Sequence, residues 1–316
     1  MHDPTNSTNN PRTAQGDRGL FRPQTRPEAH LPAGEGKAGN GQPDFMALLR
    51  EALTQPGRVA ECYHLFHSYS LSNALWVAGQ LWARGEALAP IASFNRWKEL
   101  GRVVKKGSKA LMMSMPVTVK AKADAKPEDD AQDGGKGKAS HTLFIARRNW
   151  FALHQTEPLE GAEPHDLEAK APAAWNPAHA LAALGITREA FQSSDGNTQG
   201  YALPESRRVA VSPLAVEPIK TLCHELAHCL LHSEQGRIED GPELTRSLAE
   251  VEAESVAYLC CAVLSCGNLE ASRGYIQHWL QDTSAERVTE KHARRIMGAA
   301  DKILKAGRAA PAEAEA

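Results

Sequence analysis

The residues best suited to chemistry are His224 and His228, which enclose an H-E-x-x-H pattern with Glu225 inside a segment of helical character. Positions four apart lie on one face of a helix, so the two imidazoles stand side by side with the carboxylate near the same edge. Neutral imidazoles bind zinc, and a carboxylate beside a metal-bound water can accept its proton. The pattern predicts a metal site with His224 and His228 as ligands and Glu225 as the catalytic base. The competing interpretation is a helix with two ordinary surface histidines.

A zinc site of this kind needs a third protein ligand, and a second helical segment, 248–261, offers three glutamates. Glu250 and Glu254 are four residues apart and share a face, whereas Glu252 points elsewhere. Two carboxylates on a half-buried helix repel each other unless a cation or a histidine N–H compensates them. We predict that Glu250 is the third ligand and that Glu254 orients a ligand histidine, with the reverse assignment and a plain solvated acidic face as alternatives. His232 is expected to cap the end of the first helix.

The elements that must position these residues follow from the hydrophobic pattern. The H-E-x-x-H helix is expected to start near Pro218, directly after a β-hairpin formed by 200–203 and 207–211. A strand beside the metal helix would provide an edge on which an extended peptide can pair. The other expected elements are helices at 45–53, 59–82, 176–184, 272–280 and 285–304, with a cap at Ser70–Asn73 that separates two helices, and strands at 110–119 and 141–153.

A second informative segment, 92–109, holds six Lys or Arg residues against one Glu, together with Phe94 and Trp97. Basic side chains can contact phosphates, and a flat aromatic ring can stack on an unpaired base. The candidate DNA contacts are Arg96, Trp97, Lys98, Arg102, Lys105, Lys106 and Lys109, and Arg147, Arg148 and Trp150 could extend the same surface. The alternative is an ordinary basic surface loop with Trp97 in the core.

Composition sets the remaining boundaries. The chain has 316 residues, enough for about two domains, and a formal charge of −2, so a nucleic-acid partner must be inferred from local patches. No apolar run is long enough to span a bilayer and no export signal is evident, which predicts a cytoplasmic protein with no membrane contact. The six cysteines lack zinc-knuckle spacing, and reduced, buried thiols are expected.

The predicted domain organisation follows shifts in apolar content and complexity along the chain. The segments, in order, are a disordered arm at 1–42, a DNA-binding domain at 43–157 with a disordered loop at 120–140, a linker at 158–174, a metal-binding domain at 175–305 and a disordered tail at 306–316. The arm and the tail contain too few apolar residues to bury a core.

Two stretches together resemble one family. The segment Trp97-Lys-Glu-Leu-Gly-Arg-Val-Val-Lys-Lys-Gly107 and the ending Gln155-Thr-Glu157, followed by the H-E-L-A-H helix, look like the ArdC-type antirestriction proteins. The resemblance covers residues 45–305 and implies an N-terminal single-stranded-DNA-binding domain joined to a zincin-like metallopeptidase domain. In that family two glutamates four apart fall on Glu250 and Glu254, but the position before the first is usually Glu and is Ala249 here.

The predicted fold class is therefore α+β, with N-terminal helices and a β-hairpin DNA-binding domain followed by a gluzincin-like metallopeptidase domain. The predicted function is binding of single-stranded DNA together with hydrolysis of a protein or peptide substrate at one Zn2+ per chain. Tyr201 and Tyr258 are candidate oxyanion donors. The alternative is a DNA-protecting binding protein whose metal site is structural or is not used for proteolysis.

Overall fold

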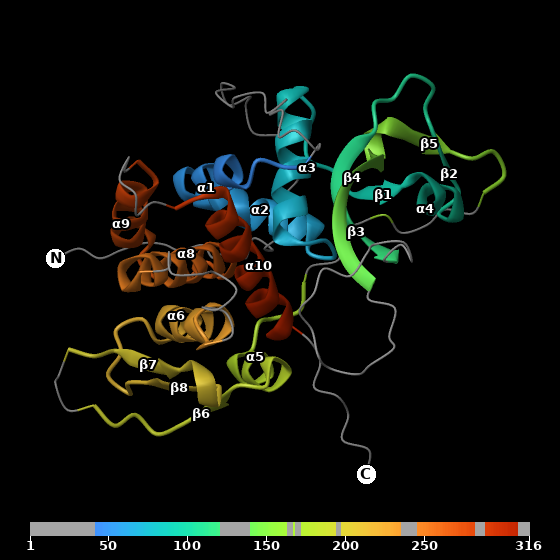
Figure 1. Ribbon diagram of the computed structural model, residues 1–316. Coiled ribbons are helices and arrows are strands. Elements are labelled where there is room, and N and C mark those ends of the chain that lie inside the picture. The colour runs from blue at the N-terminus through green and yellow to red at the C-terminus, as the bar shows by residue number, and fades with distance from the viewer. Residues whose placement is uncertain are drawn as a thin grey trace, which may run out of the picture. The chain divides into compact units, whose positions relative to one another are not determined.

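The structure, a computed structural model, describes residues 42–120, 140–162, 167, 172–193, 197–234, 245–281 and 288–308, all within one compact unit. The predicted arm (1–42) and loop (120–140) lie outside these residues except at their ends, as does most of the predicted tail (306–316). Helices and three small sheets make up the described residues, which confirms the α+β class (Figure 1).

The N-terminal part begins with three helices, which match the predicted segments 45–53 and 59–82 with a break at Ser70: α1 (Phe45–Thr54), α2 (Pro56–Phe66) and α3 (Leu71–Ala83). The first helix starts where the Asp44 side chain accepts the Ala47 N–H at 2.8 Å. Pro56 occupies the first turn of α2, where its missing N–H leaves no hydrogen bond unmade. The third helix starts where Ser70 accepts the Asn73 N–H at 3.3 Å, which is the cap that the sequence predicts.

Two small sheets follow α3 and frame the basic segment. Their elements are β1 (Ile91–Ser93), α4 (Phe94–Glu99), β2 (Arg102–Val104), β3 (Leu111–Lys120), β4 (Ser140–Ala152), the 3-10 turn Leu153–Gln155 and β5 (Thr156–Pro158). One antiparallel sheet has the order β1-β4-β3, and β2 pairs with β5 in the other. Asn73 on α3 exchanges two hydrogen bonds with the Ser114 backbone, and Gln80 does the same with Met112, at 2.8–2.9 Å. These bonds cover the outer edge of β3.

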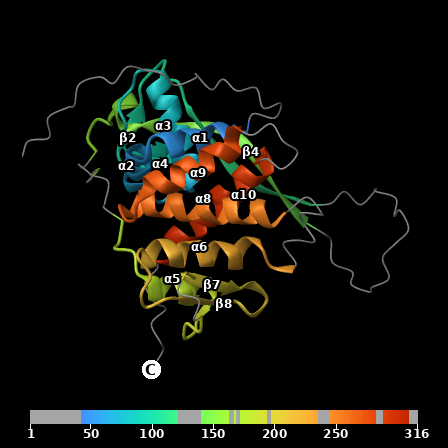
Figure 2. The ribbon, with the colours of Figure 1, turned by 90° about the vertical axis from the view of Figure 1, so that its left-hand side faces the viewer.

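The C-terminal part places the H-E-x-x-H helix between a sheet and a second helix. Its elements are α5 (Pro177–Leu184), β6 (Thr187–Arg188), β7 (Gly200–Leu203), β8 (Arg208–Val211), α6 (Pro218–Leu231), α8 (Arg246–Leu264), α9 (Leu269–Gln281) and α10 (Glu290–Ala306). Figures 1 and 2 both show α6 between α8 and the sheet β6-β8-β7. Among the described strands, β7 forms one edge of that sheet and pairs antiparallel with β8, so the predicted hairpin is confirmed.

Helix α8 is the central element of the hydrophobic core. It packs against α2, α6, α9 and α10, and the buried Tyr258 hydroxyl donates to the Leu53 carbonyl of α1 at 2.9 Å. Residues on both sides of the predicted linker (158–174) therefore share one core, and the division into two domains stays a prediction. All six cysteines are free thiols and five are buried. None of the described helices has the length and apolar character of a membrane span.

Candidate metal centre and basic surface

Helix α6 presents its two histidines to α8. The apolar side chains Leu222 and Leu226 are buried, and this fixes the rotation of the helix. The Nε2 atoms of His224 and His228 then lie 3.1 Å apart. Both approach the same carboxylate oxygen on α8, Oε2 of Glu250, at 3.3 Å and 3.5 Å respectively.

These three distances test whether a metal ion fits. Ligand atoms roughly 2.0 Å from a tetrahedrally coordinated ion are about 3.3 Å from one another. The observed separations of 3.1, 3.3 and 3.5 Å are close to that edge length. Among the described residues, His224, His228 and Glu250 form the one group of potential ligands whose atoms converge in this way. The donor set and its spacing therefore fit one divalent ion.

The second nitrogen of His224, Nδ1, lies 3.3 Å from Oε2 of Glu254, and Oε1 of Glu254 lies 2.9 Å from Lys220 Nζ. Burial lowers the pKa of His224, but hydrogen bonds to Glu250 and Glu254 outweigh it and raise that pKa to about 9. For Glu254 the effects have the opposite sign. Burial raises its pKa, but hydrogen bonds from neighbouring side chains, of which His224 is the strongest, outweigh burial and lower that pKa to about 2. In the metal-free protein a proton on His224 therefore holds the two carboxylates together, and a metal ion must displace it.

Glu225 is buried against strand β7, with 7% of its surface exposed. A Cβ atom at Gly200 would come within 3.0 Å of Glu225 Oε1, so the carboxylate rests against bare backbone. Burial raises the pKa of Glu225, and the positive charges of His224 and His228 partly oppose this shift. A buried carboxylate with a raised pKa beside two histidines is suited to accept and return a proton.

His232 is the predicted cap at the end of α6, and its backbone N–H donates to the His228 carbonyl at 2.9 Å. Its buried side chain contacts His228 Nδ1 through Nδ1 at 2.9 Å and Glu252 Oε2 through Nε2 at 2.9 Å. Glu252 points away from Glu250, as predicted, but toward this histidine. Burial raises the pKa of Glu252 to about 7. Sequence reasoning missed the pair because its members come from two helices, although a third histidine four residues after His228 was a visible signal.

A pocket of about 400 Å³ adjoins the candidate metal centre. Its lining residues are Lys220, His224, Glu250, Glu254, Ala271, Ser272 and Tyr275. The two tyrosines predicted as oxyanion donors lie elsewhere, because Tyr201 donates to Glu189 at 3.0 Å and Tyr258 donates into the core. Tyr275 on α9 is the tyrosine that borders this pocket, and sequence reasoning did not single it out.

Trp97 lies in the core, which is the alternative that the sequence analysis gives for it, and its assignment as a DNA contact is corrected. Its side chain is 2% exposed and its indole N–H donates to the Phe151 carbonyl at 2.9 Å. A buried ring offers no face on which a base can stack. The exposed aromatic residue nearby is Phe94, which packs edge-on against Phe151 and lies 4.8 Å from the Lys98 ammonium.

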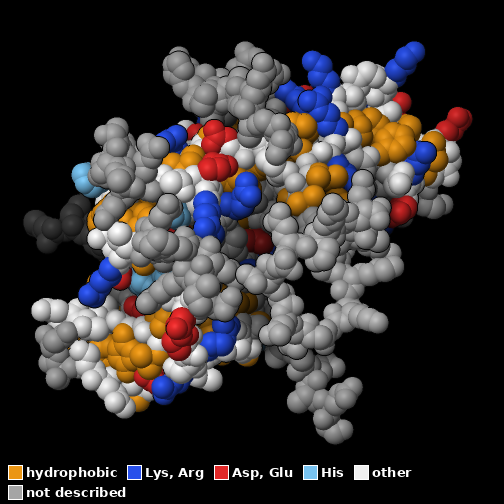
Figure 3. All heavy atoms as spheres, viewed as in Figure 1, with side chains coloured by type: hydrophobic (Ala, Val, Ile, Leu, Met, Phe, Trp, Pro, Cys, Tyr) orange, Lys and Arg blue, Asp and Glu red, His pale blue; other side chains and the backbone are white. Residues whose placement is uncertain are grey.

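The remaining predicted DNA contacts differ in their exposure and in their partners within the protein. Arg102 donates to the Thr156 hydroxyl and carbonyl at 2.8 and 3.1 Å and so ties β2 to β5, while Arg96 pairs with Glu99 at 2.7 Å. Trp150 is buried. The exposed basic residues, besides Arg96, are Lys98, Lys105, Lys106 and Lys109, with Arg147 and Arg148 on β4. Of these, Lys105 also donates from Nζ to the His154 carbonyl at 3.0 Å. Figure 3 shows Lys and Arg side chains beside an apolar patch over this part of the chain, at the upper right.

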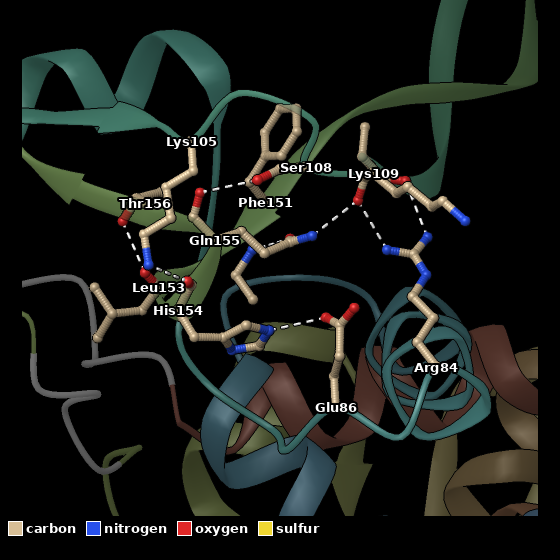
Figure 4. Close-up of polar contacts among 12 residues, drawn as sticks. Arg84, Glu86, Lys105, Ser108, Lys109, Phe151, Leu153, His154, Gln155 and Thr156 are labelled. Carbon is tan, nitrogen blue, oxygen red and sulfur yellow. Dashed lines mark hydrogen bonds and ion pairs between the residues drawn. The ribbon is translucent and has the colours of Figure 1, made fainter.

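Gln155 supports the loop that carries three of these lysines (Figure 4). Its side-chain amide donates to the Lys109 carbonyl at 3.0 Å and accepts the Ala152 N–H at 2.9 Å. Its backbone carbonyl accepts the Lys105 N–H at 2.9 Å, and Arg84 also donates to the Lys109 carbonyl at 2.8 Å. These contacts give the motif that begins at Gln155 a structural role in holding the basic loop.

Residues 52–151 match the family model described as the N-terminal domain of anti-restriction factor ArdC. This stretch includes the Trp97–Gly107 motif on which the resemblance was based. Residues 52–151 are therefore related to the N-terminal domain of ArdC-type proteins, as predicted. The match ends before the helices of the candidate metal centre.

Two solved structures of the antirestriction ArdC protein from R388 plasmid are similar to this chain. The metal-free structure is 20% identical, with a TM-score of 0.43, over 83% of this chain and 94% of that chain. The Mn(II)-bound structure is 17% identical, with a TM-score of 0.45, over 84% of this chain and 98% of that chain. No curated protein matches the sequence.

Proposed function

We propose that this protein is an H-E-x-x-H metallopeptidase that acts on proteins at single-stranded DNA. The observation that carries the proposal is the triangle of ligand atoms from His224, His228 and Glu250, with sides of 3.1, 3.3 and 3.5 Å. Two imidazoles and one carboxylate are the protein ligands of a catalytic zinc site. The buried carboxylate of Glu225 beside them is the base that such a site requires.

His224, His228 and Glu250 would hold the ion, and a set with two imidazoles favours zinc over magnesium or calcium. When bound, the ion supplies Lewis-acid activation of water and of the substrate carbonyl. Glu254 keeps the His224 ring in orientation through Nδ1, because a carboxylate on the outer nitrogen fixes the tautomer that leaves Nε2 unprotonated.

Glu225 performs the proton transfers in this proposal. It takes a proton from the attacking water, whose oxygen forms the new bond to the carbonyl carbon. It then passes that proton to the amine nitrogen as the C–N bond breaks. Tyr275, which borders the same pocket as Glu250, supplies a hydrogen-bond donor for the substrate carbonyl oxygen.

The substrate class proposed is an extended protein segment. Strand β7 is an edge strand among those described, and its Gly200 lies directly against Glu225. An extended peptide that pairs with this edge brings its backbone past the carboxylate. A folded substrate would first have to expose such a segment.

The N-terminal domain brings the site to DNA in this proposal. Support comes from the match of residues 52–151 to the N-terminal domain of ArdC and from the exposed lysines of the loop that Gln155 holds. Lysine side chains bind phosphates without reading sequence, and the exposed Phe94 offers a ring for an unpaired base. The preference for single strands depends on that ring, because bases in a duplex are already stacked.

Glu225→Gln tests the catalytic part. The amide keeps the shape of the side chain but cannot accept a proton, so cleavage of a denatured protein should fall by about 100- to 10,000-fold. Zinc content and affinity for single-stranded DNA should stay at wild-type levels, because Glu225 is neither a ligand nor near the basic loop. Cleavage at the wild-type rate would remove Glu225 from the mechanism.

A DNA-protecting binding protein whose metal is structural is the second candidate. The observation that favours it is that the family match covers the DNA-binding domain and stops before the metal helices. It predicts that Glu225→Gln protects DNA from a restriction nuclease as well as the wild type does. Loss of protection together with loss of cleavage would support the peptidase.

A further inference from the structure

We propose that His232 and Glu252 form a positioning pair that fixes the proton on Nδ1 of His228 and so keeps its Nε2 ready for a metal ion. The inference rests on the proposed function in one respect, namely that His228 is a metal ligand. It concerns two residues outside the ligand set, one from the end of α6 and one from α8.

The three side chains form a continuous chain of polar contacts. Nδ1 of His228 lies 2.9 Å from Nδ1 of His232, and Nε2 of His232 lies 2.9 Å from Oε2 of Glu252. The His232 side chain is 4% exposed and that of Glu252 is 0% exposed, so water does not compete for these contacts. Arg295 adds a positive charge 3.8 Å from the same carboxylate oxygen.

The order of donors in this chain follows from what each group can do. When Glu252 is ionised, its carboxylate only accepts, so Nε2 of His232 donates to it. Neutral His232 then has a lone pair on Nδ1, and His228 must donate to it from its own Nδ1. Nε2 of His228 is left with a lone pair directed at the Glu250 and His224 side of the site.

The reverse order would disable the ligand. If His232 donated from Nδ1, His228 would carry its proton on Nε2, where a metal ion must bind, and the lone pair of His232 would face the carboxylate. A neutral, protonated Glu252 would impose this reverse order. The position of the proton on His228 therefore decides directly between the two arrangements.

Burial of Glu252 is difficult to explain as packing alone. Its Oε1 atom has no hydrogen-bond partner among the described residues, and a buried polar atom without a partner is destabilising. An apolar side chain would fill the same space in α8 without this cost. The two proposed ligand histidines have similar outer contacts. Nδ1 of His224 contacts the Glu254 carboxylate directly, and Nδ1 of His228 is linked to the Glu252 carboxylate through His232.

The test is the zinc affinity of Glu252→Gln and His232→Leu, measured by competition with a chelator. Outer contacts of ligand histidines are typically worth about 10- to 100-fold in metal affinity. Each variant should therefore bind zinc about 10- to 100-fold more weakly, and the double variant should lose no more than the larger single loss, because both act through His228. Ser255→Ala is the matched control, since Ser255 is buried on the same helix and should leave zinc affinity unchanged.

A second measurement keeps the inference testable if a variant does not fold. Nitrogen-15 NMR of the metal-free wild-type protein at alkaline pH should show His228 protonated on Nδ1. Protonation on Nε2, or zinc affinity in the folded variants within about twofold of wild type, would overturn the inference. A wild-type protein that binds no zinc would overturn the proposed function, and the NMR result would still decide the orientation of His228.

Discussion

Gly200→Ala is the substitution that best probes how strand β7 holds Glu225. The added Cβ would lie 2.6 Å from Thr221 Cγ2, 2.9 Å from the Ala210 carbonyl oxygen and 3.0 Å from Glu225 Oε1. The two side chains can rotate away, but the carbonyl belongs to β8, the strand paired with β7, so β7 itself must shift. Overpacking of this kind destabilises a protein by about 1–3 kcal/mol. The same shift moves the carboxylate of Glu225, and a displaced base costs up to roughly 100-fold in rate.

Urea unfolding and cleavage of a denatured protein measure the two effects separately. Gly79→Ala is the control, because Gly79 lies inside α3 and a Cβ there would meet no atom within 4 Å. It should stabilise the protein by about 0.5–1 kcal/mol, since alanine favours the helix. Zinc affinity should be unchanged in both variants, as neither residue contacts a proposed ligand nitrogen. A Gly200→Ala protein that is as stable as wild type and cleaves at the full rate would refute the close contact between β7 and Glu225.

Three further predictions concern pH, DNA affinity and the core. In the metal-free protein, the raised pKa of His224 contributes stability that is complete below pH 6.5 and is lost as pH rises through about 9. The lowered pKa of Glu254 contributes stability that is lost as pH falls from 4.5 to about 2. Urea unfolding in chelator should therefore show a loss on the order of 3 kcal/mol between pH 6.5 and 9, and unchanged stability there would contradict the ion cluster. Replacement of Lys106 and Lys109 by glutamine should reduce the salt dependence of single-strand binding by a slope of roughly 1.4, whereas an unchanged slope would exclude both from phosphate contact. Trp97→Ala should cost about 3–5 kcal/mol in unfolding free energy, and a loss of DNA affinity without any loss of stability would restore Trp97 as a DNA contact.

The H-E-x-x-H helix and its partner could be predicted because their information is local. Spacing of four residues places His224 beside His228 whatever surrounds them, and the same spacing places Glu250 beside Glu254. The fold class and the strands on either side of the low-complexity loop follow from periodicity in the same way. The hydrophobic pattern on the inner faces of the two helices indicates that they pack against each other. It does not indicate which residues of one helix lie opposite which residues of the other.

The residues that sequence reasoning missed depend on such packing between elements. Glu252 contacts His232 only because of the position at which α8 packs against α6. From the sequence, the spacing of the three glutamates on α8 indicates only that Glu252 faces away from Glu250 and Glu254. Trp97 sits among basic residues that suggest a surface, yet α4 is a short helix whose one buried side chain is this indole. Tyr275 lies far along the chain from the histidines, so α9 must fold back before it can be recognised as part of the pocket.

The central position of α8 limits how the two proposed activities can be separated by mutation. The helix carries Glu250 on the side that meets α6, and farther along it Tyr258 donates to the Leu53 carbonyl in the N-terminal helices. A substitution in the core of α8 should therefore disturb the metal centre and the N-terminal helices together. Loss of both activities in such a variant would say nothing about whether DNA binding and cleavage depend on each other. Changes outside the core of α8, such as substitutions of Lys106 in the basic loop and of Glu225 at the site, can show that dependence.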